Sequence, residues 1–149
     1  MKLFHNIIVS VFIKPEEDYD LIKAKFLSLF PFDLDEIKIP IMEKNASTFN
    51  ERKIKIVEVK LVRNKIVSQF MEHIKEKMSE GDRSMILRQL DNRIDEELNF
   101  FFRFSKKRML EDKFVVVDHG DCFHLKCHVV SYPKRKEKAI KSLIDFFSC

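Results

Sequence analysis

Residues 99–110 read NFFFRFSKKRML: four phenylalanines within five positions, followed at once by a basic run. In a β-strand successive side chains point to opposite faces, so one face of this segment carries Phe100, Phe102 and Phe104. The other face carries Phe101 and Arg103. Three aligned phenylalanines make the broad apolar surface that helices pack against in a layered fold. We therefore expect residues 98–104 to form a strand whose three-phenylalanine face lies in the core.

Strand and helix patterns alternate along the rest of the chain. Alternating apolar residues predict strands, and apolar residues at three- and four-residue spacing predict helices. The expected strands are 3–13, 36–44, 52–62, 98–104, 113–118 and 122–131, and the expected helices begin at Pro15, Asn64, Asp82 and Pro133. The order β-α-β-β-α-α-β-β-β-α indicates an α+β fold. We expect residues 1–149 to form a single domain, a mostly antiparallel sheet with helices packed on one face.

Three of the expected strands also indicate their position in the sheet or an irregularity in it. Residues 3–13 are apolar on both faces, which is typical of a central strand. Pro40 cannot donate a backbone hydrogen bond, so we expect the strand 36–44 at a sheet edge, followed by a turn at 45–51. In the next strand the apolar phase changes at Ile56–Val57, which predicts a β-bulge there.

Charge is unevenly distributed in this chain of 149 residues, which has a net charge of +4. Residues 15–36 are net acidic, whereas residues 38–65 and 99–149 are net basic. We expect the fold to gather these blocks into an acidic and a basic face. No apolar stretch is long enough to span a bilayer, and the first residues lack a small-residue cleavage site. We therefore expect a cytoplasmic protein without a membrane partner.

Histidines and cysteines cluster near the end of the chain: His119, Cys122, His124, Cys127 and His128. On a strand, His124 and His128 lie about 13 Å apart at ~3.3 Å per residue, which is too far for one zinc ion. Cys127 points to the opposite, core-facing side. We therefore expect neither a metal nor a cofactor. The chain also lacks a P-loop, a Gly-x-Ser-x-Gly motif and a His-Glu-x-x-His motif, so we expect no enzymatic activity.

Two short segments concentrate positive charge. Lys106, Lys107 and Arg108 follow the phenylalanine strand, and a second set opens the last expected helix: Lys134, Arg135, Lys136 and Lys138. Cations oppose the dipole at a helix N-terminus, at a cost of about 0.3–1 kcal/mol each. A bound phosphate would explain the second set, whereas a solvated turn is the alternative for the first. On the strand itself, Phe101 and Arg103 could each stack a base.

Four segments, in their order and spacing, resemble a family of small archaeal RNA-binding proteins and exosome-associated subunits. They are HNIIVSVFIKPEED (5–18), KIVEVKLVRNKIVSQF (55–70), NFFFRFSKKRML (99–110) and SYPKRKEKAIKSLIDFF (131–147). The family pattern has L-x-L-R-F-D/S-K where this chain has NFFFRFSK, and Tyr-Pro-x-Lys-Arg-x-x-Ala where it has YPKRKEKA. The resemblance covers nearly the whole chain. It implies RNA as a ligand and a fold similar to the large-subunit ribosomal protein at the 5S RNA contact.

The residues and the resemblance together predict a non-catalytic RNA-binding protein, an accessory subunit of the exosome or of ribosomal or other RNA-processing proteins. The expected RNA contacts are Phe101, Arg103, Lys106, Lys107, Arg108, Lys134, Arg135, Lys136 and Lys138. The alternative is a protein–protein interaction module, or a homodimeric accessory subunit, that does not bind RNA directly. Charge reversal in the basic segments separates the two, because only RNA binding depends on those cations.

Overall fold

The computed structural model describes residues 2–47 and 53–148 of the chain. Its strands form one six-stranded sheet in the order β2-β3-β1-β6-β4-β5, and every neighbouring pair is antiparallel. The strands are β1 (Phe4–Ile13), β2 (Met42–Ser47), β3 (Lys53–Leu61), β4 (Asn99–Ser105), β5 (Val116–Val117) and β6 (Cys122–Val129). β1 lies between β3 and β6, which confirms the central position predicted from its two apolar faces.

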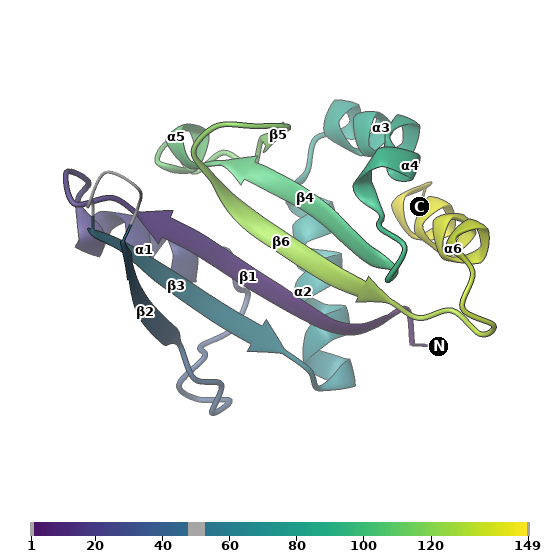
Figure 1. The fold of residues 1–149 in the computed structure, drawn as a ribbon, viewed down its shortest axis with the longest axis horizontal. Helices are drawn as coiled ribbons and strands as arrows, with labels where there is room; N and C mark the ends of the chain where they lie inside the picture. Colours follow the sequence, from purple (N-terminus) through teal and green to yellow (C-terminus); the bar gives the residue numbers. More distant parts are fainter. Residues whose placement is uncertain (1, 48–52, 149) are drawn as a thin grey trace.

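The helices are α1 (Tyr19–Leu27), α2 (Asn64–Lys77), α3 (Glu80–Arg88), α4 (Leu90–Arg93), α5 (Lys106–Met109) and α6 (Lys136–Ser148). α1 and α2 lie behind the sheet in Figure 1, and α3, α4 and α6 lie beside β4. No helix of the described residues lies in front of the sheet in that view. The predicted α+β fold, with helices on one face, is confirmed, and the one-turn helices α4 and α5 are additions to the predicted order.

The three-phenylalanine face of β4 lies in the core, as predicted. Phe100, Phe102 and Phe104 are fully buried. The Phe102 ring lies between the other two, with centroid distances of 5.3 Å to Phe100 and 5.6 Å to Phe104. Aromatic rings attract one another at such distances beyond the area that they bury. The strand thus supplies the apolar surface on which the helices pack.

Helices at both ends of the sheet contact this core face through aromatic rings. Phe26 of α1 lies 6.4 Å from Phe123 of β6, measured between ring centroids. Phe147 of α6 lies 5.7 Å from Phe100 of β4. The same face is therefore covered from end to end, which leaves the opposite face of the sheet for other contacts. Within the described ranges, no helix is both long enough and apolar enough to cross a membrane.

The segment before β2 differs from the prediction. Its alternating isoleucines predict a strand over 36–44, but β2 begins only at Met42. Upstream, Ile39 N donates to Leu34 O at 2.9 Å, and Lys38 has a left-handed φ of 59°. This turn buries Leu34 and Ile39, so these apolar residues serve the core without a strand. β2 forms a sheet edge, as predicted, but it includes residues 45–47, where a turn was expected. Residues 48–51 of that expected turn lie outside the described residues.

The predicted β-bulge in β3 is wrong. Phe12 pairs with Ile56 and Val11 with Val57 in one continuous register. Val57 is buried on the core face, and Ile56 is half-buried on the other. The change of apolar phase therefore reflects apolar residues on both faces of the strand. A register shift occurs instead at the start of β1, opposite β6.

Two of the three cysteines are shielded from solvent. Cys127 is fully buried, as predicted, with its Sγ 3.9 Å from Met71 Sδ of α2, and Cys122 is also buried. Burial raises the pKa of both thiols, which disfavours the reactive thiolate.

We expect a Cys149→Ser variant to react slowly with Ellman's reagent at mildly alkaline pH while it is folded. Two thiols, those of Cys122 and Cys127, should become reactive in urea, because unfolding exposes them and returns their pKa to the ordinary range. Absorbance of the released thiolate measures both states. A thiol that reacts within minutes in the folded variant would contradict the burial described above.

Candidate nucleic-acid interface

The face of the sheet opposite the helices is called the open face from here on. The strand register places alternate residues of each strand on it. They are Asn6, Ile8, Ser10 and Phe12 of β1; Met42 and Lys44 of β2; Ile54, Ile56, Glu58 and Lys60 of β3; Asn99, Phe101 and Arg103 of β4; and His124, Lys126 and His128 of β6. All of them are exposed or half-buried. Ala46 of β2 shares this face, as do Ser105 of β4 and Cys122 of β6, and these last two are buried. A ligand on this face could therefore contact five strands at once.

Phe101 and Arg103 lie on the open face, as the alternation in β4 predicts. Phe101 pairs with Lys126 of β6, and Arg103 pairs with His124. Arg103 Nη1 donates to the backbone oxygen of Asp118 at 3.3 Å. That hydrogen bond holds the half-buried guanidinium at the β5 side of the face.

Basic residues outnumber acidic ones on the open face. Four cations, Lys44, Lys60, Arg103 and Lys126, accompany the single carboxylate of Glu58 among the strand residues described. Clustered cations raise the local concentration of a polyanion and bind its phosphates. The face thus has the charge that a nucleic acid requires.

An aromatic pair adjoins Arg103. The rings of Phe12 and His124 have centroids 5.5 Å apart, and Phe12 is 47% exposed. Burial, followed by the charges of Arg103 and Lys106, lowers the pKa of His124, so its ring is neutral at neutral pH. A depression of about 350 Å³ adjoins these rings, lined by residues of β1, β3, β4 and β6.

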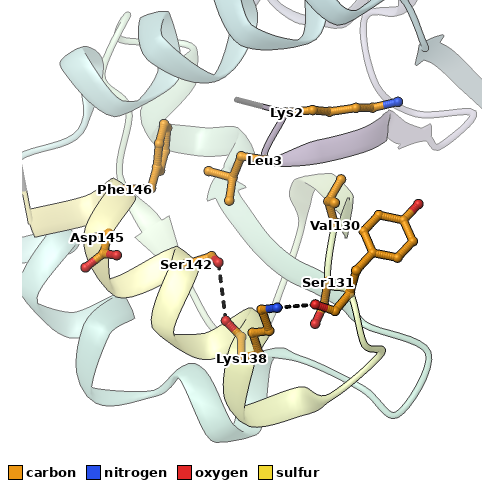
Figure 2. A pocket seen from close by; sticks show the side chains of 9 residues that line it. Lys2, Leu3, Val130, Ser131, Lys138, Ser142, Asp145 and Phe146 are labelled. Atoms are coloured by element: carbon orange, nitrogen blue, oxygen red, sulfur yellow. Dashed lines mark hydrogen bonds between the residues drawn. The ribbon is translucent and has the colours of Figure 1, made fainter.

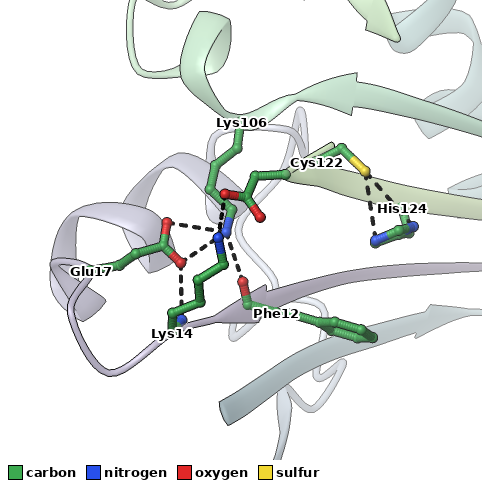
Figure 3. Close-up of polar contacts among 7 residues, drawn as sticks. Phe12, Lys14, Glu17, Lys106, Cys122 and His124 are labelled. Atoms are coloured by element: carbon green, nitrogen blue, oxygen red, sulfur yellow. Dashed lines mark hydrogen bonds and ion pairs between the residues drawn. The ribbon is translucent and has the colours of Figure 1, made fainter. Parts of the chain in front are cut away.

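Lys106 departs from the prediction, because its ammonium group is buried (Figure 3). Nζ donates to Phe12 O at 2.7 Å and to the two Glu17 carboxylate oxygens at 3.0 and 3.2 Å. Lys14 Nζ and Asp121 Oδ2 form a second ion pair nearby, at 2.5 Å. These contacts join the end of β1 to the ends of β4 and β6. Lys106 is therefore not available for the phosphate contact expected from the sequence.

The expected basic turn is the one-turn helix α5. Ser105 Oγ accepts a hydrogen bond from Arg108 N at 3.1 Å and caps this helix. Lys107 and Arg108 are exposed, and Arg108 also pairs with Glu111 at 3.4 Å. Two of the three predicted cations in this segment therefore face solvent.

The second basic set lies at the other end of β4. α6 begins at Lys136, so Lys134 and Arg135 precede the helix. Lys134 Nζ lies 3.3 Å from the carboxylate of Glu97, and Lys136 Nζ lies 4.0 Å from that of Glu96. Both glutamates come before β4, whereas α5 follows it. At ~3.3 Å per residue, the length of β4 separates the two sets by about 20 Å, so they form two patches.

Lys138 lies at a hollow between the start of β1, the segment after β6, and α6 (Figure 2). The hollow has a volume of about 480 Å³, and Leu3, Val130 and Phe146 contribute apolar lining. Lys138 Nζ donates to the backbone oxygen of Tyr132, whose side chain is 72% exposed. This contact holds the ammonium group of Lys138 against the backbone of the segment between β6 and α6.

Histidines on the open face pack against neighbouring side chains. The rings of His128 and His5 have centroids 5.0 Å apart. His124 Nε2 lies 3.6 Å from Cys122 Sγ. Within residues 2–47 and 53–148, no three His, Cys, Asp or Glu side chains come together in a group that could hold a metal ion.

A family model described as RNA binding matches residues 6–129. The chain belongs to this RNA-binding family. The matched segment runs from β1 to the end of β6, so it contains α5 and every residue assigned above to the open face. The second basic set, Lys134 to Lys138, lies beyond it.

Archaeal proteins resemble the chain in sequence and, where structures are solved, in fold. It is 25% identical over 144 residues to the RNA-binding protein PAB1135 of Pyrococcus abyssi, covering 95% of this chain and 92% of that protein. The crystal structure of protein AF2318 from Archaeoglobus fulgidus superposes with a TM-score of 0.83 at 25% identity, covering 93% and 95% of the two chains. Mth689 from Methanothermobacter thermautotrophicus, a DUF54 protein, gives 0.79 at 25% identity, covering 97% and 98%.

Proposed function

We propose that this protein binds RNA on its open face and does so without catalysing a reaction. The observation that carries the proposal is the open face itself, which presents four cations and the rings of Phe12 and Phe101 to solvent. Cations neutralise phosphates, and exposed rings stack bases regardless of sequence. Membership of the RNA-binding family supports the choice of ligand.

An RNA strand lying along β4 would reach both basic patches. The cations at the ends of β4 are Lys107 and Arg108 on one side and Lys134, Arg135, Lys136 and Lys138 on the other. Phe101 and Arg103 lie between them on the same strand. Neutralising about five phosphates would give a slope of log K against log salt near −3.5 for a single strand.

We further propose that the protein acts as an accessory subunit that presents RNA to processing proteins, the exosome among them. The resemblance of its four segments to exosome-associated subunits supports this role. A pull-down from archaeal lysate, with and without ribonuclease, tests it. Exosome subunits retained after ribonuclease treatment would indicate a direct protein contact, and their absence from both samples would contradict the proposal.

Phe101→Ala and Arg103→Ala are expected to weaken RNA binding in different ways. Loss of the Phe101 ring removes about 1–3 kcal/mol of stacking, so the Kd rises while the salt slope is unchanged. Loss of the Arg103 guanidinium removes one phosphate contact, so the slope becomes shallower by about 0.7. Fluorescence anisotropy with an oligo-A strand and with a structured RNA, over a range of salt concentrations, measures both effects.

Two substitutions behind the sheet provide matched controls. Leu27→Ala in α1 removes an exposed apolar side chain, and Lys77→Ala in α2 removes an exposed cation. Neither should change the affinity or the slope. Equal losses in the controls and the open-face variants would contradict the assignment to this face. Failure of the unsubstituted protein to bind either RNA at low salt would refute RNA binding and favour the interaction module.

A further inference from the structure

A pit lies at the centre of the open face, over Ser10. Ser10 pairs with Glu58 of β3 on one side and with His124 of β6 on the other. Ile8 and Phe12 flank it along β1, on the same face. Because the serine side chain is the smallest of the five, the other four form walls around it. All five residues line the depression of about 350 Å³ described above.

The depression of about 350 Å³ has room for a single base. The Cα atoms of Ile8 and Phe12 are four residues apart, which is about 13 Å along the strand. Those of Glu58 and His124 are two strand spacings apart, about 10 Å. Two walls are apolar, and the other two carry a carboxylate and a neutral imidazole. A flat aromatic ligand with polar edges matches this alternation of apolar and polar walls.

Glu58 is the unexpected member of the group. It is the single carboxylate among the cations of the open face, and it is half-buried. Within the described ranges, no other residue forms a side-chain hydrogen bond or ion pair with its carboxylate. An anion here repels phosphate, so a surface that recognised only the backbone of RNA would bind it more tightly without this carboxylate. An ionised carboxylate only accepts hydrogen bonds, so the partner that suits it is a donor edge of a base.

We propose that the pit accepts one unpaired guanine of single-stranded RNA, whose N1–H and N2–H groups donate to the Glu58 carboxylate. The inference rests on the proposed RNA-binding function and names the base that is read. Among the RNA bases, guanine presents two adjacent N–H donors on its Watson–Crick edge. Adenine and cytosine present one amino group beside an acceptor nitrogen, and uracil presents one N–H between two carbonyl oxygens. Paired hydrogen bonds to an ionised group are stronger than a single neutral one.

The position of the cations agrees with this orientation of the base. The sugar is attached to guanine on the side opposite the Watson–Crick edge, so the backbone would lie away from Glu58, toward β6 and β4. Lys126 and Arg103 occupy that side and line the same depression. The phosphates would therefore meet cations while the base meets the carboxylate. An unpaired base is required, because pairing would occupy the edge that Glu58 reads.

Anisotropy titrations with oligo-U strands that carry one central guanosine, adenosine or inosine test the proposal. The guanosine strand should bind roughly tenfold more tightly than the adenosine strand, with inosine between them because it lacks the N2 amino group. Glu58→Gln should reduce this preference to about twofold or less. Its affinity for plain oligo-U should stay equal or increase, because a negative charge is removed. Loss of structure would instead weaken binding to all strands together.

Ser10→Val gives a second variant, which fills the pit without changing the charge and suits a β-strand. It should also lose the guanosine preference, whereas Glu76→Gln, which removes an exposed carboxylate of α2, should retain it. Equal binding of the guanosine and adenosine strands by the unsubstituted protein, or full preference in Glu58→Gln, would overturn the guanine site and leave RNA binding intact. Failure to bind any strand, oligo-U included, would overturn both.

Discussion

Replacing Phe102 by alanine is expected to lower the free energy of unfolding by about 3–5 kcal/mol. The ring is fully buried on the core face of β4, between the rings of Phe100 and Phe104. Leu125 of β6 pairs with Phe102, so the backbone around the site is held in the sheet and cannot close over the space. The loss therefore combines reduced apolar burial with a cavity. Urea unfolding followed by circular dichroism measures the change.

Phe101→Ala is the matched control on the same strand. Its ring is half-buried on the open face and not packed in the core, so its removal should cost about 1 kcal/mol or less. The same variant should lose RNA affinity, as argued above. Similar destabilisation by Phe101→Ala and Phe102→Ala would contradict the assignment of the two faces of β4.

Lys106→Met is expected to lower the free energy of unfolding by about 3 kcal/mol. The substitution keeps much of the apolar stem but removes the ammonium donor from the Phe12 carbonyl and from the Glu17 carboxylate, which keeps only the backbone N–H of Lys14 as a donor among the described residues. Glu17 is 19% exposed, so water offsets part of the penalty, and the effect lies at the low end for a broken buried pair. Adding Glu17→Gln removes the uncompensated charge, so the double variant should be more stable than Lys106→Met alone. Urea unfolding of both variants measures these differences.

Lys107→Met separates the structural role of Lys106 from RNA binding. Lys107 is the exposed neighbour, and its loss should change stability by less than about 0.5 kcal/mol. If Lys107 binds a phosphate, its loss should also make the salt slope for single-stranded RNA shallower by about 0.7. Folded Lys106→Met should keep the slope of the unsubstituted protein. Lost RNA affinity in Lys106→Met without lost stability would show that its ammonium group faces the ligand.

Local alternation was sufficient to predict the two faces of β4. The period of two in a strand depends only on backbone geometry, so Phe102 could be assigned to the core and Arg103 to the opposite face without knowledge of the partner strands. The central position of β1 followed in the same way from apolar residues on both of its faces. Such features depend only on neighbours in sequence, and for that reason they could be predicted from the sequence.

Lys106 could not be placed in this way, because its partners are distant in sequence. The basic run does not reveal that Ser105 caps a helical turn, which directs Lys106 inward and Lys107 outward. The group around Ser10 was missed for the same reason. The sequence did contain a local signal for Glu58. It lies between two valines, so alternation places it on the face of the strand away from them. Only the register of three strands shows that it lies across Ser10 from His124.

The central position of β1 also has a consequence for how the chain reaches its folded state. Val9 pairs with Val59 on one side and with Leu125 on the other, so the two partner strands are made at very different times during synthesis. β3 can pair with β1 as soon as it leaves the ribosome. The other edge of β1 remains unpaired until β6 has been synthesised. During that interval its backbone N–H and C=O groups are open to pairing with other chains. Partners so distant in sequence also slow folding, so the nascent protein passes through an aggregation-prone interval that ends only when β6 pairs.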